Sequence, residues 1–210
     1  MGGKLILAVV LALCSGAGAA SACQSRATPL LDDNFKTADP GWGQADNIAA
    51  FTADGLVLTP PVGGSAWRWN TGYSMARADL CVQVMNPTRL PSPANEDTVG
   101  AVGVWFWGAD SQNFYTATIS LDGTIAITRL VRGSWKTVIA PVPSTTVKTA
   151  PGAVNEIEVV TNGNNARFYV NGSKIEDFQG QPPQGGGPPG VYGESGPTST
   201  SWVFHRVQLF

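Results

Sequence analysis

The chain has 210 residues, a length that suits one domain with a substantial core, and its 13 basic and 15 acidic side chains give a net charge of −2. It contains no basic block that could neutralise a run of phosphates, which argues against nucleic acid as a partner. With 25 glycines, 15 prolines and only 13% charged residues, the composition predicts many short strands joined by turns.

The N-terminus has the pattern of a secretory signal peptide. Lys4 precedes an apolar stretch at 5–13, and small residues follow up to Ala22. The apolar stretch is too short to span a bilayer, which needs about 20 residues. We therefore expect residues 1–22 to be removed during export, to the periplasm or the medium, and residues 23–210 to form a single mature domain.

Removal of residues 1–22 would leave two cysteines, Cys23 and Cys81. In an oxidising compartment such a pair favours a disulfide. The alternative is a lipid anchor on Cys23, as in bacterial lipoproteins. Against it, Ala20 stands where that recognition site usually has a larger aliphatic residue, and lipidation would use up the only partner left for Cys81. The sequence favours the disulfide and leaves the anchor open.

Alternating and apolar runs predict about a dozen strands in the mature region. The expected strands lie at 30–35, 51–60 (a hairpin turning at 54–55), 65–70, 76–86, 98–108, 113–121, 124–131, 133–140, 154–161, 166–170, 173–178 and 201–210. Residues 38–43 are expected to turn, and the Pro-rich and Gly/Pro-rich stretches 87–97 and 179–190 to form loops.

Two dipeptides mark hairpins. Asp122-Gly123 predicts a type I′ turn, which needs positive φ, and Asn171-Gly172 predicts another turn. Strands of this number and length bury their faces as two packed sheets.

Three segments carry a resemblance to a known family: "GVWFWGADSQNFYTATISLDGTIAITRLVRGSWKTV" (103–138), "NEIEVVTNGNNARFYVNGSKIEDF" (155–178) and "GVYGESGPTSTSWVFHRVQL" (190–209). They resemble concanavalin A-like lectin/glucanase domains, of the laminin-G-like jelly-roll type, in exported bacterial proteins. The resemblance covers 98–210 and implies an all-β fold, a two-sheet antiparallel jelly-roll sandwich. It implies little about chemistry, because such domains serve as lectins, hydrolases, adhesion modules and sensor domains.

No catalytic motif is evident. Laminarinase-type hydrolases of the resembling family carry a Glu-x-Asp-x-Glu pattern, and the pair Glu156 and Glu158 does not match it. Their alternation with apolar neighbours predicts a solvated strand face instead. His205 is the only histidine, so a Ser or Cys nucleophile has few candidate bases and a Cys/His zinc site lacks ligands. The sequence favours a protein without catalytic activity but leaves an enzyme open, and it indicates no cofactor and no Cys/His metal site.

The sequence leaves a structural calcium site open. Calcium-binding members of the resembling family often place an Asp on the closing strand, where this chain has Phe204-His205-Arg206. That substitution argues against a structural calcium. Asp32 and Asp33 remain as ligands for a metal site elsewhere.

The seven tryptophans are the main signal for a ligand, because sugar rings stack on aromatic faces while polar groups bind their hydroxyls. Trp67 and Trp69 share one face of a predicted strand, and so do Trp105 and Trp107. If Val102, Val104 and Phe106 face the core, Trp105 and Trp107 line the outer, concave sheet where the resembling fold binds. The opposite assignment stays open, since a sandwich core also accommodates tryptophan. The predicted ligand-binding residues are Trp67, Trp69, Trp105, Trp107, Asp110, Asn113, Tyr115 and Glu194.

Trp135 and Trp202 each begin a strand and are predicted to pack in the core. The sequence as a whole favours an exported, non-catalytic carbohydrate-binding module of lectin type, with a glycan as its partner. One alternative is a secreted glycoside hydrolase that uses acids among Asp110, Glu156, Glu158 and Glu194. Another is a structural or adhesion module with a protein partner.

Overall fold

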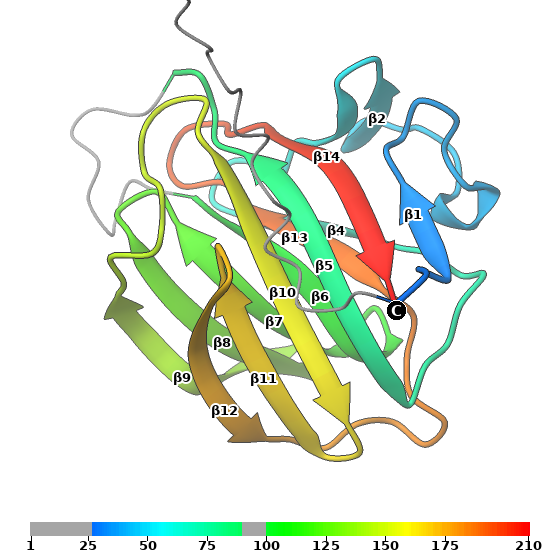
Figure 1. Ribbon diagram of the computed structural model, residues 1–210. Helices are drawn as coiled ribbons and strands as arrows, with labels where there is room; N and C mark the ends of the chain where they lie inside the picture. The colour runs from blue at the N-terminus through cyan, green and yellow to red at the C-terminus, as the bar shows by residue number, and fades with distance from the viewer. Residues whose placement is uncertain (1–26, 90–99) are drawn as a thin grey trace, which may run out of the picture.

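The computed structural model describes residues 27–89 and 100–210. The predicted signal peptide, Cys23 and most of the predicted loop at 87–97 lie outside the described residues. Two antiparallel β-sheets lie one behind the other in Figure 1 and form a sandwich. This confirms the predicted all-β, two-sheet antiparallel architecture. No helix within 27–89 and 100–210 is long and apolar enough to cross a membrane.

The larger sheet has eight strands. They are β1 (Leu31–Asp33), β2 (Ala49–Thr52), β3 (Gly55–Leu58), β5 (Arg77–Met85), β10 (Val154–Asn162), β11 (Asn165–Val170), β12 (Ser173–Gln179) and β14 (Trp202–Leu209). Their order is β12-β11-β10-β5-β14-β3-β2, and β1 also pairs with β14. A 3₁₀ turn, Pro40–Trp42, lies between β1 and β2.

The smaller sheet has six strands. They are β4 (Ser65–Trp69), β6 (Ala101–Asp110), β7 (Asn113–Ser120), β8 (Thr124–Val131), β9 (Ser134–Pro143) and β13 (Gly190–Glu194). Their order is β4-β13-β6-β7-β8-β9, so β4 and β9 are the edges. The chain therefore crosses between the sheets six times, from β3 to β4, β4 to β5, β5 to β6, β9 to β10, β12 to β13 and β13 to β14.

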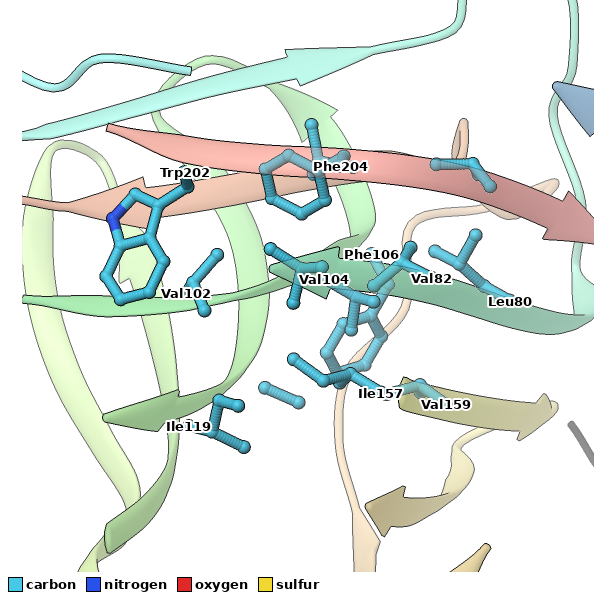
Figure 2. Packing of buried hydrophobic residues seen from close by; sticks show 14 of the residues in the cluster. Leu80, Val82, Val102, Val104, Phe106, Ile119, Ile157, Val159, Trp202 and Phe204 are labelled. Atoms are coloured by element: carbon cyan, nitrogen blue, oxygen red, sulfur yellow. The ribbon is translucent and has the colours of Figure 1, made fainter. Parts of the chain in front are cut away.

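Apolar side chains from both sheets meet between them (Figure 2). Val102, Val104 and Phe106 on β6 lie in this core and are at most 4% exposed, as predicted. From the other sheet, β5, β10 and β14 contribute Leu80, Val82, Ile157, Val159 and Phe204. Because alternate residues of a strand face opposite sides, Trp105 lies on the outer face of the six-stranded sheet.

The two predicted hairpin turns differ in type. Asn171 and Gly172 both have positive φ, 50° and 79°, between the paired residues Val170 and Ser173, which is the geometry of a type I′ turn. At the other hairpin only Gly123 has positive φ, 86°. Asp122 accepts hydrogen bonds from the backbone N–H and the hydroxyl of Thr124. The expected type I′ turn is therefore wrong there, because the Asp side chain stabilises a different local geometry.

Candidate functional site

Aromatic side chains cover part of the outer face of the six-stranded sheet. The set, called here the outer aromatic cluster, consists of Trp67, Trp69, Trp105, Phe114, Leu130, Trp135 and Tyr192. All six strands of the sheet contribute to it. It is separate from the sandwich core, which lies on the other side of the same sheet.

The strand register explains how two of these indoles meet. Gly190 on β13 pairs with Trp69 on one side and with Trp105 on the other. The two indoles stack with ring centroids 5.2 Å apart and an interplanar angle of 15°. A Cβ at Gly190 would lie 3.1 Å from side-chain atoms of Trp105. A glycine at this position therefore leaves room for the Trp105 side chain beside it.

Ring contacts across the sheet show that this face is concave. β9 and β13 are separated by β8, β7 and β6, which would place them about 19 Å apart in a flat sheet. Yet the Trp135 and Tyr192 ring centroids are 5.9 Å apart, and those of Trp67 and Phe114 are 5.1 Å apart. The sheet must curl around the cluster to bring these rings together.

Members of the cluster differ in exposure. Trp105, Phe114 and Tyr192 are at most 1% exposed and form its floor. Trp67 and Trp69 are half-buried, whereas Trp135 is 43% exposed. The aromatic surface that a ligand can reach therefore belongs to β4 and β9, at the two edges of the sheet. The expectation that Trp135 packs in the core is wrong, because β9 is an edge strand with solvent beside it.

Trp107 does not share a face with Trp105. The pairing of β6 with β7 shifts after Phe106, and Trp107 has a φ of 47°. This bulge turns the Trp107 indole into the core, where it packs against Phe106 and Tyr115 with centroids 5.3 Å apart in both pairs. The expectation of two tryptophans on one outer face is therefore wrong, because a bulge interrupts the period-two alternation.

The polar side chains of the loop at 110–113, predicted to bind the ligand, form hydrogen bonds within the loop and with Arg132. Asp110 accepts from the Gln112 N–H at 2.7 Å and from Asn113 Nδ2 at 2.9 Å, and these donors lower the pKa of its carboxyl. The Asn113 side-chain oxygen accepts from the Arg132 N–H at 3.0 Å. Asp110 and Asn113 thus build the β6–β7 turn.

Tyr115 lies on the core side of β7 and is 3% exposed, and its hydroxyl accepts from the Gln181 N–H at 2.9 Å. Its neighbour Phe114 lies on the outer side and joins the cluster. Sequence analysis missed Phe114 as a site residue. The alternation along 113–120 would have placed Phe114 and Tyr115 on opposite faces.

Glu194 is fixed beside the cluster. The Tyr192 hydroxyl donates to Glu194 Oε1 at 2.6 Å, and Trp202 Nε1 donates to the Glu194 carbonyl oxygen at 3.0 Å. Burial, followed by the neighbouring Glu194 charge, raises the pKa of Tyr192, so the phenol keeps its proton and remains a donor. Trp202 itself is 0% exposed in the core, as predicted.

Small side chains continue the outer face beyond the cluster. Gly103, Thr118 and Ala126 lie side by side in the register of β6, β7 and β8. One row nearer the cluster, the hydroxyls of Thr116 and Thr128 are 2.7 Å apart. Thr116 is 0% exposed, so this pair of hydroxyls belongs to the interior of the face, and the aromatic rings are its accessible part.

The other candidate acids lie elsewhere. Glu156 and Glu158 lie on the opposite side of the sandwich, on the outer face of the eight-stranded sheet, and are 8% and 2% exposed. Gln83 Nε2 donates to Glu156 at 3.2 Å. The expectation of a solvated face is wrong, because β10 is an inner strand whose side chains are flanked by those of β5 and β11.

The residues weighed as metal ligands have other partners. Asp32 accepts two hydrogen bonds of 2.6 Å from Arg206, and this interaction lowers the pKa of Asp32. Asp33 accepts from two backbone N–H groups and from Trp42 Nε1. His205 Nδ1 lies 2.7 Å from the Asp54 carbonyl oxygen. Across 27–89 and 100–210, no group of three or more His, Cys, Asp or Glu side chains could hold a metal ion.

Cys81 is 1% exposed and lies on the outer face of the eight-stranded sheet, opposite Glu158 and Gln208. Its predicted partner, Cys23, is not among the described residues. The Cys23–Cys81 disulfide, like the lipid anchor, therefore stays a prediction.

No protein-family model matches the chain, and no curated protein sequence matches it. Solved structures do resemble it. The carbohydrate-binding module CBM66 from Bacillus subtilis has a TM-score of 0.62 at 15% identity, covering 80% of this chain and 94% of that module. A Bacillus licheniformis beta-glucanase has a TM-score of 0.60 at 13% identity, covering 85% and 96%. The carbohydrate recognition domain of Emp46p has a TM-score of 0.58 at 13% identity, covering 84% and 94%. The chain has the concanavalin A-like jelly-roll fold.

Proposed function

We propose that this chain is a non-catalytic carbohydrate-binding protein that stacks a glycan on the accessible rings of the outer aromatic cluster. The observation that carries the proposal is the 43% exposure of Trp135 on a concave face. A tryptophan so exposed leaves a large apolar area in water, which a sugar ring would cover. The half-buried Trp67 and Trp69 extend this surface on the facing edge strand.

Two of the three structural relatives support the choice of ligand, since CBM66 and the Emp46p domain are named for carbohydrate binding. The signal-peptide pattern at 1–22 supports a further part of the proposal, that the protein is exported to the periplasm or the medium and meets glycans there.

A glycoside hydrolase is the weaker candidate. It needs two carboxyl groups on either side of the scissile bond. Of the four acids considered for that role, only Glu194 lies on the concave face; Asp110 forms a turn, and Glu156 and Glu158 lie on the other sheet. The beta-glucanase relative shares the fold with this chain at 13% identity.

Titration of the purified protein with soluble oligosaccharides, followed by tryptophan fluorescence, tests the proposal. We expect a saturable change without new products by chromatography. Trp135→Ala should weaken binding on the order of tenfold, as loss of a stacking contact of about 1.4 kcal/mol would. Trp67→Ala should act in the same direction.

Val154→Ala is the matched control, because Val154 is 38% exposed but lies on β10 in the other sheet. It should bind as the unchanged protein does. Product formation would instead support the hydrolase. If no sugar changes the tryptophan fluorescence, glycan binding is contradicted and the protein-partner alternative is favoured.

A further inference from the structure

We infer that the glycan taken by this face is uncharged and that Glu194 determines this choice by accepting hydrogen bonds from sugar hydroxyls. The inference rests on the proposed function and adds the class of sugar to it.

The concave face carries almost no charge. Among the described strand residues whose register places them on this face, Glu194 is the only charged one; the others are aromatic, hydroxyl-bearing, Gly, Ala, Leu or Pro. The Arg and Lys side chains of these strands alternate along the chain with the residues of the concave face. They therefore lie on the opposite face of the sheet. Arg68, between Trp67 and Trp69, pairs with Asp46, and Arg129 and Lys136 pair with each other in register.

An acidic sugar would therefore meet an unfavourable environment. Recognition of carboxylate or sulfate groups relies on Arg or Lys, which bind them through charge-assisted hydrogen bonds. Here the charged group that the register places on the face is itself a carboxylate, that of the half-buried Glu194. Like charges brought together in a partly desolvated site repel, so a uronic acid bound beside Glu194 is disfavoured.

A neutral sugar finds the complementary group. An ionised carboxylate accepts hydrogen bonds at about four lone-pair positions, and the Tyr192 hydroxyl occupies one of them, on Oε1. Tyr192 is 0% exposed, so this donor holds the carboxylate in one orientation before any ligand arrives. A group held in this way loses less conformational entropy on binding. The remaining acceptor positions can receive hydroxyls of a sugar stacked on Trp67, whose ring lies 6.4 Å from that of Tyr192.

Isothermal titration calorimetry with two sets of probes tests the inference. Neutral gluco-, manno- and xylo-oligosaccharides form one set, and oligogalacturonate is the anionic probe. We expect the unchanged protein to bind its best neutral probe at least about tenfold more tightly than oligogalacturonate, the effect of one charge-assisted hydrogen bond against one repulsion. This comparison uses only the unchanged protein, so it does not depend on whether a variant folds.

Glu194→Gln removes the charge but keeps an oxygen that can accept from Tyr192. It should weaken neutral binding about tenfold and narrow the difference between the two sets. Tyr192→Phe removes only the hydroxyl that orients Glu194, so a smaller loss with the same preference for neutral sugars is expected. The control is Glu176→Gln, which makes the same change of charge at an exposed position on β12 of the other sheet and should change nothing.

The possible outcomes distinguish failure of the inference about Glu194 from failure of the proposed function. If the protein binds neutral sugars but Glu194→Gln binds them equally well, or if oligogalacturonate binds as tightly as the neutral probes, the inference is overturned and the proposed function stands. If the unchanged protein binds neither set, the proposed function itself fails.

Discussion

Asp33 organises the segment between β1 and β2 through one buried carboxylate. It is 5% exposed and accepts from the Phe35 and Asp39 N–H groups at 2.7 Å and from Trp42 Nε1 at 3.0 Å. Three donors compensate for the cost of burying the charge. They also hold Phe35 at a φ of 62°, which a non-glycine residue adopts only when its surroundings favour it. Three of the about four acceptor positions of this carboxylate are therefore used within the segment.

Asp33→Ala should therefore lower the free energy of unfolding by about 3 kcal/mol, because three buried donors lose an acceptor and each costs roughly 1 kcal/mol. Denaturant unfolding measures this. Asp177→Ala is the control, since its ion pair with Lys174 is exposed on both sides and should contribute little. A loss for Asp33→Ala as small as that of the control would contradict the role assigned to Asp33.

At the scale of the element, β6 serves two clusters because it changes its alternation along its length. As far as Phe106, odd and even residues face opposite sides, and then the bulge at Trp107 sends a second indole into the core. Gly108 follows, and a Cβ there would lie 1.7 Å from the Trp105 ring. The Trp105 indole therefore lies directly against the bare backbone of the bulge.

Gly108→Ala should displace Trp105 and so disturb the floor of the outer aromatic cluster. We expect a loss of about 2 kcal/mol from overpacking, with a change in near-ultraviolet circular dichroism and weaker glycan binding. Gly133→Ala is the comparison. A Cβ at Gly133 meets nothing within 4 Å, although its φ is 75°. That variant should cost only backbone strain of about 1 kcal/mol and leave the tryptophan signal unchanged. Equal spectra for the two variants would count against the contact between Gly108 and Trp105.

At the scale of the whole molecule, the eight-stranded sheet places the start of the described chain near Cys81. Leu31 on β1 pairs with Leu209 on β14, which pairs with Leu80, the neighbour of Cys81 on β5. Leu31 is therefore two strand spacings, about 10 Å, from Leu80. Cys23 precedes Leu31 by eight residues, which can extend over about 26 Å. The predicted Cys23–Cys81 disulfide is therefore within reach of the chain.

We predict that the exported protein contains this disulfide. Thiol titration should then detect no reactive cysteine until a reductant is added, and reduction should lower the free energy of unfolding by about 4 kcal/mol through the loop-closure entropy. Cys81→Ala should show the same lower stability without reductant. A mature N-terminus that carries lipid on Cys23, seen by mass spectrometry, would contradict the prediction and support the anchor.

The sequence by itself determined the class of fold and nearly all strand positions, and it favoured the core face that β6 has, because turn chemistry and period-two alternation act over a few neighbouring residues. It also pointed to tryptophans as the candidate site. Only the tertiary structure decided which of them form it. Trp107 left the outer face through a bulge, and Trp135 gained exposure because β9 is the last strand of its sheet.

Phe114 contacts Trp67 because the sheet curls, and Glu194 is oriented beside the cluster because the Tyr192 hydroxyl donates to it. Sheet order, curvature and edges arise from pairings between residues far apart in the chain, such as Trp67 with Tyr192. No short stretch of sequence contains that information, so the position of the site followed from the fold.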